Sequence, residues 1–222
     1  YELVIRDWSS DVCSSDLEMY QRYATYIFRV VKAKMGNYLI FFPSYQFMED
    51  VYQEFTQLLA SDEEEMELVI QQKHMDEEER ENFLRAFEMG REKSLIGFGV
   101  LGGIFSEGID LTNEKLIGTL IIGTGLPQVC NEREILKSYF DQKGLYGFDY
   151  AYRYPGMNKV LQAAGRVIRT EDDRGVILLL DERFQREKGK EIFPKEWADC
   201  ERCRLDIVEE KIRLFWEKQT DN

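Results

Sequence analysis

Short apolar runs separated by helical stretches constrain the fold of this chain more than any other feature. Residues 38–42 and 176–180 are continuous apolar runs, as expected of strands buried on both faces. Residues 94 to about 101 and 116–122 are two further strand candidates, and residues 67–70 form a shorter one. Strands that alternate with helices predict an α/β fold, in which a mostly parallel central sheet carries helices on both faces.

The helices are predicted from apolar residues that recur three and four positions apart. Ser44 stands where its hydroxyl can cap the second helix, and Gly36 with Asn37 ends the first. We expect the segment 144–154, which is rich in Tyr and Gly, to form an ordered loop. The expected helices span residues 20–34, 44–59, 76–89, 131–142, 157–168 and 205–218.

The composition restricts both the compartment and the partners. A chain of 222 residues can form one well-cored domain. Four cysteines, one histidine and the lack of an apolar run near the roughly 20 residues of a membrane span predict a cytoplasmic protein without a membrane partner. The net charge of −13 argues against a general affinity for nucleic acid. Much of the acidic excess lies in residues 62–67 and 76–81, where a solvated face is the simpler explanation.

One string carries the strongest chemical signal, Gln162-Ala-Ala-Gly-Arg166-Val-Ile-Arg169. Residues three and four apart on a helix share a face. The amide of Gln162 and the guanidinium groups of Arg166 and Arg169 can therefore converge on one oxyanion. Arginine suits phosphate because its planar fork donates two parallel, charge-assisted hydrogen bonds. Two solvated arginines on a surface helix would give the same short string, and only further motifs can decide between these interpretations.

Further motifs stand upstream and downstream in a consistent order. The run Phe105-Ser106-Glu107-Gly108-Ile-Asp110-Leu resembles motif V of the XPD/DinG-type superfamily-two helicases, and the Gln162 string resembles their motif VI. Residues 39–45 are similar to motif IV of that family, and residues 175–184 to its closing strand. The resemblance covers roughly residues 36 to 185 and implies a RecA-like three-layer sandwich, the C-terminal motor domain of a DNA helicase.

The resemblance also implies roles for the residues of the Gln162 string. Arg169 resembles the arginine finger, Arg166 a second contact to the γ-phosphate, and Gln162 a group that orients the phosphate or the attacking water.

For motif V, the resemblance implies that Glu107, Gly108 and Asp110 couple the nucleotide state to the grip on the strand, and that Asp110 can reach the ribose. Gly108 as a tight-turn residue and Asp110 as a cap are equally good explanations.

Four residues are candidates for the track of single-stranded DNA. Ser44 and Tyr45 follow one predicted strand, and Phe105 and Ser106 follow another. The end of a strand is where a parallel α/β sheet presents its ligands. Hydroxyls and backbone amides can hold phosphates without net positive charge. DNA binding is therefore partly reconciled with the negative net charge of the chain.

The chain lacks a P-loop, so it cannot form a complete ATPase site. By the resemblance, a missing N-terminal motor domain would bind most of the ATP and Mg²⁺, and that missing part can carry an iron–sulfur cluster. We expect the isolated chain to be inactive and to hold no metal, because Cys200 and Cys203 form only one ligand pair. Cys130 is expected to be a small packing residue and His74 a surface residue.

Two alternative functions stay open. The first is a non-catalytic RecA-like module for nucleic-acid or protein contacts. The second is a dinucleotide-binding oxidoreductase, because Gly97-Phe-Gly99-Val-Leu-Gly102 matches the glycine fingerprint, with Glu114 downstream. The second lacks the strand-to-helix context that the fingerprint requires. Asp181 and Glu182 imitate a Walker B strand, but without a P-loop they fit the closing strand of the helicase family.

The N-terminus differs in character from the rest. Residues 7–17 have neither helical nor strand periodicity, and one back-translation of them resembles a sequencing adaptor. We therefore expect residues 1–17 to be an assembly artefact or a disordered leader, and residues 18–222 to form the helicase C-terminal RecA-like domain of a longer protein.

Overall fold

A seven-stranded, parallel sheet forms the centre of the computed structural model, which describes residues 2–7, 16–62, 65–88, 92–105, 116–168, 173–185 and 192–218. The strand order is β3-β4-β2-β5-β6-β1-β7, and every pair of neighbours is parallel. The strands are β1 (Glu2–Asp7), β2 (Asn37–Phe42), β3 (Met66–Ile70), β4 (Ser94–Val100), β5 (Gly118–Ile122), β6 (Gly175–Leu180) and β7 (Glu201–Cys203). The prediction of a parallel α/β sheet is confirmed.

The central strands are buried along their whole length, which explains their continuous apolar runs. Every residue of β2, β5 and β6 is buried, as expected where helices cover both faces of a sheet. Successive side chains of β2 enter opposite layers: Tyr38, Ile40 and Phe42 lie in one core cluster, and Leu39 and Phe41 in the other.

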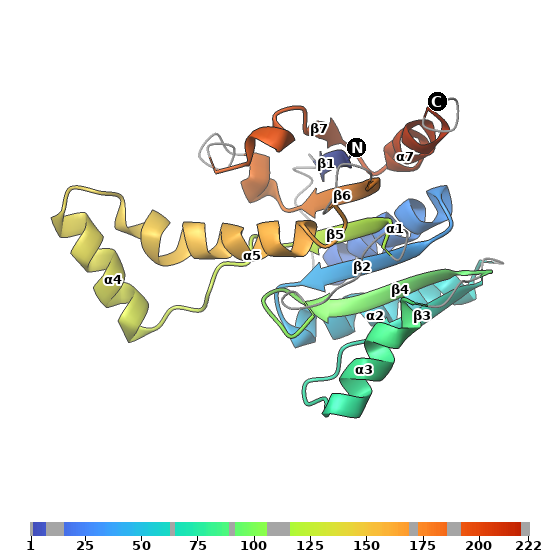
Figure 1. The fold of residues 1–222 in the computed structure, drawn as a ribbon, viewed down its shortest axis with the longest axis horizontal. Helices are drawn as coiled ribbons and strands as arrows, with labels where there is room; N and C mark the ends of the chain where they lie inside the picture. Colours follow the sequence, from blue (N-terminus) through green and yellow to red (C-terminus); the bar gives the residue numbers. More distant parts are fainter. Residues whose placement is uncertain are drawn as a thin grey trace.

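Helices form the two outer layers (Figure 1). On one face α1, α2 and α7 supply the buried side chains of the first cluster, and on the other face α3 and α5 supply those of the second. The helices are α1 (Asp16–Ala33), α2 (Tyr45–Ala60), α3 (Glu77–Ala86), α4 (Asn131–Gln142), α5 (Tyr154–Ala164) and α7 (Val208–Glu217). Shorter elements are the π-helix η2 (Asp149–Arg153) and the 3₁₀ turns η3 (Glu182–Gln185) and η4 (Lys195–Trp197).

Two helix starts behave as their sequences predict. The Ser44 hydroxyl accepts a hydrogen bond from the Phe47 amide at 3.3 Å and caps α2. Asp76 and Glu79 form a reciprocal capping box at α3, with N–O distances of 2.8 and 2.9 Å. The acidic run at residues 76–81 therefore lies at a helix N-terminus, where the helix dipole stabilises negative charge.

Both ends of the chain differ from the prediction. Residues 2–7 are not a disordered leader, because they form β1 between β6 and β7 and bury Val4 and Ile5. Helix α1 begins at Asp16, and residues 8–15 lie outside the described residues. The segment around Cys203 forms the strand β7, and the last helix, which was expected from residue 205, begins at Val208. A strand of three residues is too short to show an alternating pattern, and it pairs with β1 from the opposite end of the chain.

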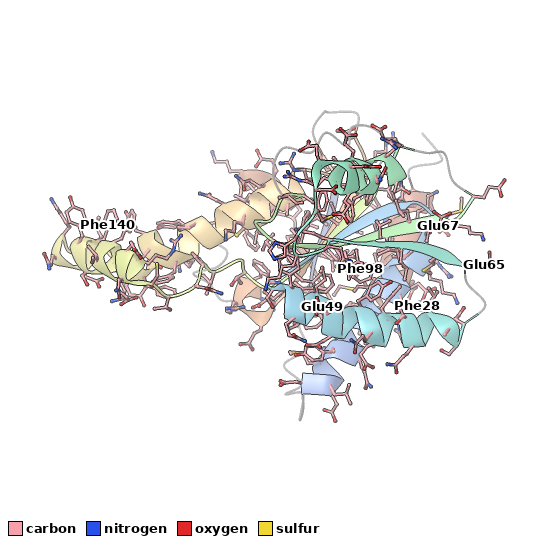
Figure 2. All side chains as sticks on the ribbon, turned by 90° about the horizontal axis from the view of Figure 1, so that it is seen from below. Phe28, Glu49, Glu65, Glu67, Phe98 and Phe140 are labelled. Carbon is pink, nitrogen blue, oxygen red and sulfur yellow. The ribbon has the colours of Figure 1, made fainter. Side chains whose placement is uncertain are left out.

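The expected loop at residues 144–154 contains the π-helix η2, which continues directly into α5. Together with α4 this region forms an arm that projects from the sheet (Figure 1), and none of the α4 residues is buried. Figure 2 shows Phe140 far out on this arm, whereas Phe98 lies in the body of the domain.

Candidate functional site

The parallel topology separates the predicted site residues into two groups. Ser44 and Tyr45 follow the end of β2, at the carboxyl edge of the sheet. Arg166 instead follows α5 and precedes β6. Its neighbour Val167 packs on the first residue of β6, because a Cβ added to Gly175 would lie only 2.0 Å from the Val167 Cγ1 atom. Arg166 therefore lies toward the amino end of β6, away from the carboxyl edge.

The prediction that residues 157–168 form one helix is wrong. Helix α5 ends at Ala164, and Gly165 is its exposed C-cap. Beyond it the amides of Arg166 and Val167 bond to carbonyls three residues back, at 3.3 and 3.1 Å. Gln162 lies exposed on the last turn, and Arg166 is half-buried in the tighter turn that follows. Arg169 lies outside the described residues.

Most of the predicted motif V also lies outside the described residues, namely Ser106, Glu107, Gly108 and Asp110. Phe105 is described, and its assignment to the DNA track is corrected. Its side chain is 1% exposed and stacks on the Phe83 ring at 4.0 Å between centroids, so no face of it is open to a base. An aromatic residue after a strand serves here to fill the core beneath α3.

An open cleft of about 630 Å³ lies at the carboxyl edge beside Tyr45. It is formed by the start of α2, the connection from β3 to α3 and the loop after β4. Its lining residues are Tyr45, Gln71, Gln72, Lys73, His74, Met75, Asp76, Glu79, Arg80, Gly103 and Ile104. Of these, Tyr45 alone is predicted from the sequence to have a binding role.

Gln71 organises this cleft. It is 2% exposed, its Nε2 atom donates to the Tyr45 hydroxyl at 2.8 Å, and its Oε1 atom accepts from the Val100 amide at 2.9 Å. The two glycines beside it leave room for its amide, because an added Cβ would lie 3.3 Å from Oε1 at Gly99 and 3.1 Å from Nε2 at Gly103. The amide thus links three strand ends and fixes the orientation of the Tyr45 ring.

The glycines of β4 exclude the dinucleotide-binding alternative. Gly97 and Gly99 lie inside β4 and not in a strand-to-helix turn, so they cannot form the phosphate-binding loop of that fingerprint. Gly97 is required by packing, because a Cβ there would lie 2.6 Å from the Phe87 ring and 2.9 Å from Leu39.

Basic and acidic side chains balance in the cleft, although the chain as a whole carries a net charge of −13. Lys73 and Arg80 line it, and the carboxylates of Asp76 and Glu79 are engaged in the capping box. The predicted surface position of His74 is confirmed, since the residue is exposed. The cleft therefore combines hydroxyl, amide and cationic groups, which is the chemistry that phosphate oxygens require.

Ser44 and Lys159 are two further polar residues near the carboxyl edge of the sheet. The exposed Ser44 hydroxyl accepts from the Phe47 amide and retains its own proton to donate. Lys159 on α5 crosses the loop after β4: a Cβ added to Gly102 would lie 2.9 Å from its Cδ and Cε atoms and 3.1 Å from its ammonium. Gly102 has a φ of 76°, so only glycine adopts this turn without strain. No local pattern singled out Lys159.

The other candidates have structural explanations. Asp181 does not behave as a free Walker B acid, because its two oxygens accept from the Arg183 Nε and Nη2 atoms at 2.8 and 2.6 Å. This pairing raises the pKa of Arg183. Cys130 is exposed at the start of α4, which corrects its expected packing role.

Within the described ranges, no group of three or more His, Cys, Asp or Glu side chains could hold a metal ion. Among the helices that the structure describes, none is long and apolar enough to cross a membrane.

The parallel sheet order and the two helical layers define a RecA-like α/β domain. The chain belongs to the helicase C-terminal domain family, whose model matches residues 27–200. This confirms the predicted family and fold.

Relatives and solved structures agree with this assignment. The ATP-dependent DNA helicase XPD of Sulfolobus acidocaldarius is 28% identical over 173 residues, which cover 75% of this chain and 28% of that protein. The XPD/RAD3 helicase subunit of general transcription and DNA repair factor IIH of Saccharomyces cerevisiae is 27% identical over 186 residues, 79% of this chain and 23% of that protein. An apo structure of XPD has the same fold, with a TM-score of 0.70 and 21% identity over 91% of this chain and 40% of that one. The chain thus spans about a quarter of the length of these curated relatives.

Proposed function

We propose that this chain is the C-terminal half of an ATP-dependent motor that moves on single-stranded DNA. One observation carries the proposal: α5 connects two separate surfaces of a single domain. Gln162 lies on its last turn, and Arg166 lies in the tighter turn just beyond its end at Ala164. Lys159, which precedes Gln162 on α5, lies over the loop after β4 at the carboxyl edge of the sheet. A shift of one surface can therefore be transmitted to the other through one helix.

The nucleotide surface would complete an ATP site that begins on another domain. Arg169 and Arg166 are proposed to contact the γ-phosphate from the opposite side, and Gln162 to orient the phosphate or the attacking water. Glu107, Gly108 and Asp110 are proposed to sense the nucleotide. Most of the ATP and its Mg²⁺ would be bound by an N-terminal motor domain in the longer protein, and an iron–sulfur cluster, if present, would belong there too.

The strand surface is proposed to be the cleft beside Tyr45. Tyr45 offers a hydroxyl, Lys73 and Arg80 offer cationic groups, and the exposed Ser44 hydroxyl stands on the residue before Tyr45. The cleft can therefore bind successive phosphates although the chain as a whole is acidic. Closure of the two motor domains on ATP and their reopening after hydrolysis would then move the strand by alternating grip and release.

The arginine assignment is tested in the full-length protein with Arg169→Ala. An arginine finger is worth roughly a thousand-fold or more in turnover, so we expect the variant to lose DNA-stimulated ATPase activity while its nucleotide affinity stays nearly unchanged. Arg213→Ala is the matched control, because this exposed arginine pairs with its helix neighbour Glu209 on α7, which covers the face of the sheet opposite α5. An unchanged turnover number for Arg169→Ala would refute the assignment and favour the non-catalytic module.

A further inference from the structure

A second, more enclosed cavity of about 300 Å³ lies between the arm and the sheet. Its walls come from the residues just after β5, from η2 and the start of α5, and from the segment after β6. The residues that matter here are Thr124, Tyr146, Phe148, Asp149, Arg153 and Met157. The cleft beside Tyr45 and this cavity follow the ends of parallel strands, so both belong to the carboxyl edge of the sheet.

The polar groups in the cavity wall are only partly paired. Asp149 is 7% exposed, and its Oδ2 atom accepts from the Arg153 Nη2 atom at 2.7 Å. The Asp149 Oδ1 atom, the Arg153 Nε atom and the Thr124 hydroxyl are buried without a hydrogen-bond partner in the described part of the chain. Buried polar groups are nearly always paired, so an acceptor, a donor and a hydroxyl left open around one cavity indicate a missing polar ligand.

The backbone holds these groups in place. Gly125 and Gly156 allow the loop after β5 and the start of α5 to touch, because a Cβ on Gly156 would lie 2.7 Å from the Thr124 carbonyl oxygen. The wider π-helical turn of η2 brings Asp149 and Arg153 together, and such turns recur at functional sites. Arg133 of α4 donates to the Ala151 carbonyl at 2.6 Å and ties the arm to this turn.

Aromatic side chains form the mouth of the cavity. Tyr146 and Phe148 are 58% and 38% exposed, and the Phe148 ring stacks on Tyr152 at 5.2 Å between centroids. An exposed aromatic face held by a second ring is a platform on which a nucleobase can stack, whatever its identity.

We infer that this cavity binds one unstacked base of the single-stranded DNA that passes over the carboxyl edge. The inference rests on the proposed function, which brings the strand to this edge. Every base presents hydrogen-bonding donors and acceptors on its edge, and these match the open acceptor of Asp149, the open donor of Arg153 and the hydroxyl of Thr124. Stacking on Phe148 and hydrogen bonds to groups that every base can match predict that binding requires a base in the strand. The affinity should depend little on the DNA sequence.

The experiment compares two fluorescein-labelled oligonucleotides of equal length, one of deoxythymidine and one of abasic residues, by fluorescence anisotropy with the full chain at low salt. Thr124→Val removes the hydroxyl at nearly constant shape, and Phe148→Leu removes the stacking face. Each is expected to weaken binding of the deoxythymidine strand about five-fold or more while leaving the abasic strand unaffected. Tyr139→Leu, which removes an exposed ring of α4 outside the cavity, is the matched control and should bind both strands normally.

The outcomes separate the two proposals. If wild type binds both oligonucleotides equally, or if the two cavity variants behave as the control, the base site is refuted while DNA binding stands. If neither oligonucleotide binds, both proposals fail for this chain. A second measurement locates the contact: a strand carrying 5-iododeoxyuridine should photocrosslink to Tyr146 or Phe148, and a crosslink confined to other peptides would overturn the inference.

Discussion

Replacing Gln71 by methionine tests whether one buried amide organises the carboxyl-edge cleft. Methionine is unbranched and close to glutamine in shape, so the space between Gly99 and Gly103 stays filled while both hydrogen bonds are lost. The Tyr45 hydroxyl can turn to water, but the Val100 amide at the end of β4 loses its partner.

The magnitude follows from these two bonds. Each lost hydrogen bond costs about 1 kcal/mol, and the half-buried amide left without a partner adds up to about 1 kcal/mol more. The free energy of unfolding should therefore fall by about 2–3 kcal/mol, which corresponds to roughly 4–12 °C in Tm for a chain of this size. Urea denaturation followed by circular dichroism measures the free energy directly.

Tyr45→Phe is the matched control, because it removes only the bond between Gln71 and the Tyr45 hydroxyl. It should cost about 1 kcal/mol, and in the double variant the two effects should be less than additive. If Gln71→Met destabilises the domain no more than Tyr45→Phe, the Val100 amide does not depend on Gln71, and the proposed organisation of the cleft is wrong.

Three further predictions concern packing, ionisation and capping. Gly97→Ala should lower the free energy of unfolding by about 1–3 kcal/mol in urea denaturation, because its Cβ would meet the Phe87 ring; an unchanged midpoint would contradict the packing role of this glycine. The hydrogen bond to Glu134 raises the pKa of Tyr152 to about 12. Its stabilising effect should be full below the ordinary tyrosine pKa and be lost as the pH rises from there through the raised pKa of about 12; ultraviolet titration should show the pKa fall in Glu134→Gln, and no fall would mean the bond is absent in solution. Asp76→Ala should destabilise the domain by about 1 kcal/mol through loss of the capping box, whereas the neighbouring exposed Glu77→Ala should cost less in the same assay.

Local patterns predicted most of the central sheet and several helices. The strands β2, β4, β5 and β6 appear within two residues of their expected bounds, because burial on both faces leaves a continuous apolar run. Helix α2 starts after Ser44 as predicted, since a hydroxyl cap acts on amides two and three residues away. The apolar runs and the helix cap are local: each lies within a few residues of the strand or helix that it specifies.

The errors have a common cause, which is that the deciding contact comes from far along the chain. Strand β1 pairs with β6 and β7, so its six residues become a strand through partners at the opposite end of the sequence. Phe105 follows a strand end, as a ligand-binding residue would, but the packing of α3 buries it against Phe83. Gly165 lies inside the helix predicted for residues 157–168, but it ends α5 instead.

The sequence alone determined the class of fold, the family and the order of the motifs, because apolar periodicity, caps and short strings act over neighbouring residues. Only the tertiary structure decided that Arg166 lies toward the opposite edge of the sheet from Ser44 and Tyr45, and that Lys159 of α5 reaches the loop after β4. It also brought Tyr45, Gln71 and Val100 within hydrogen-bonding distance across three different strand ends. Such contacts depend on strand order and register, which follow from the packing of the whole core and leave no local mark in the sequence.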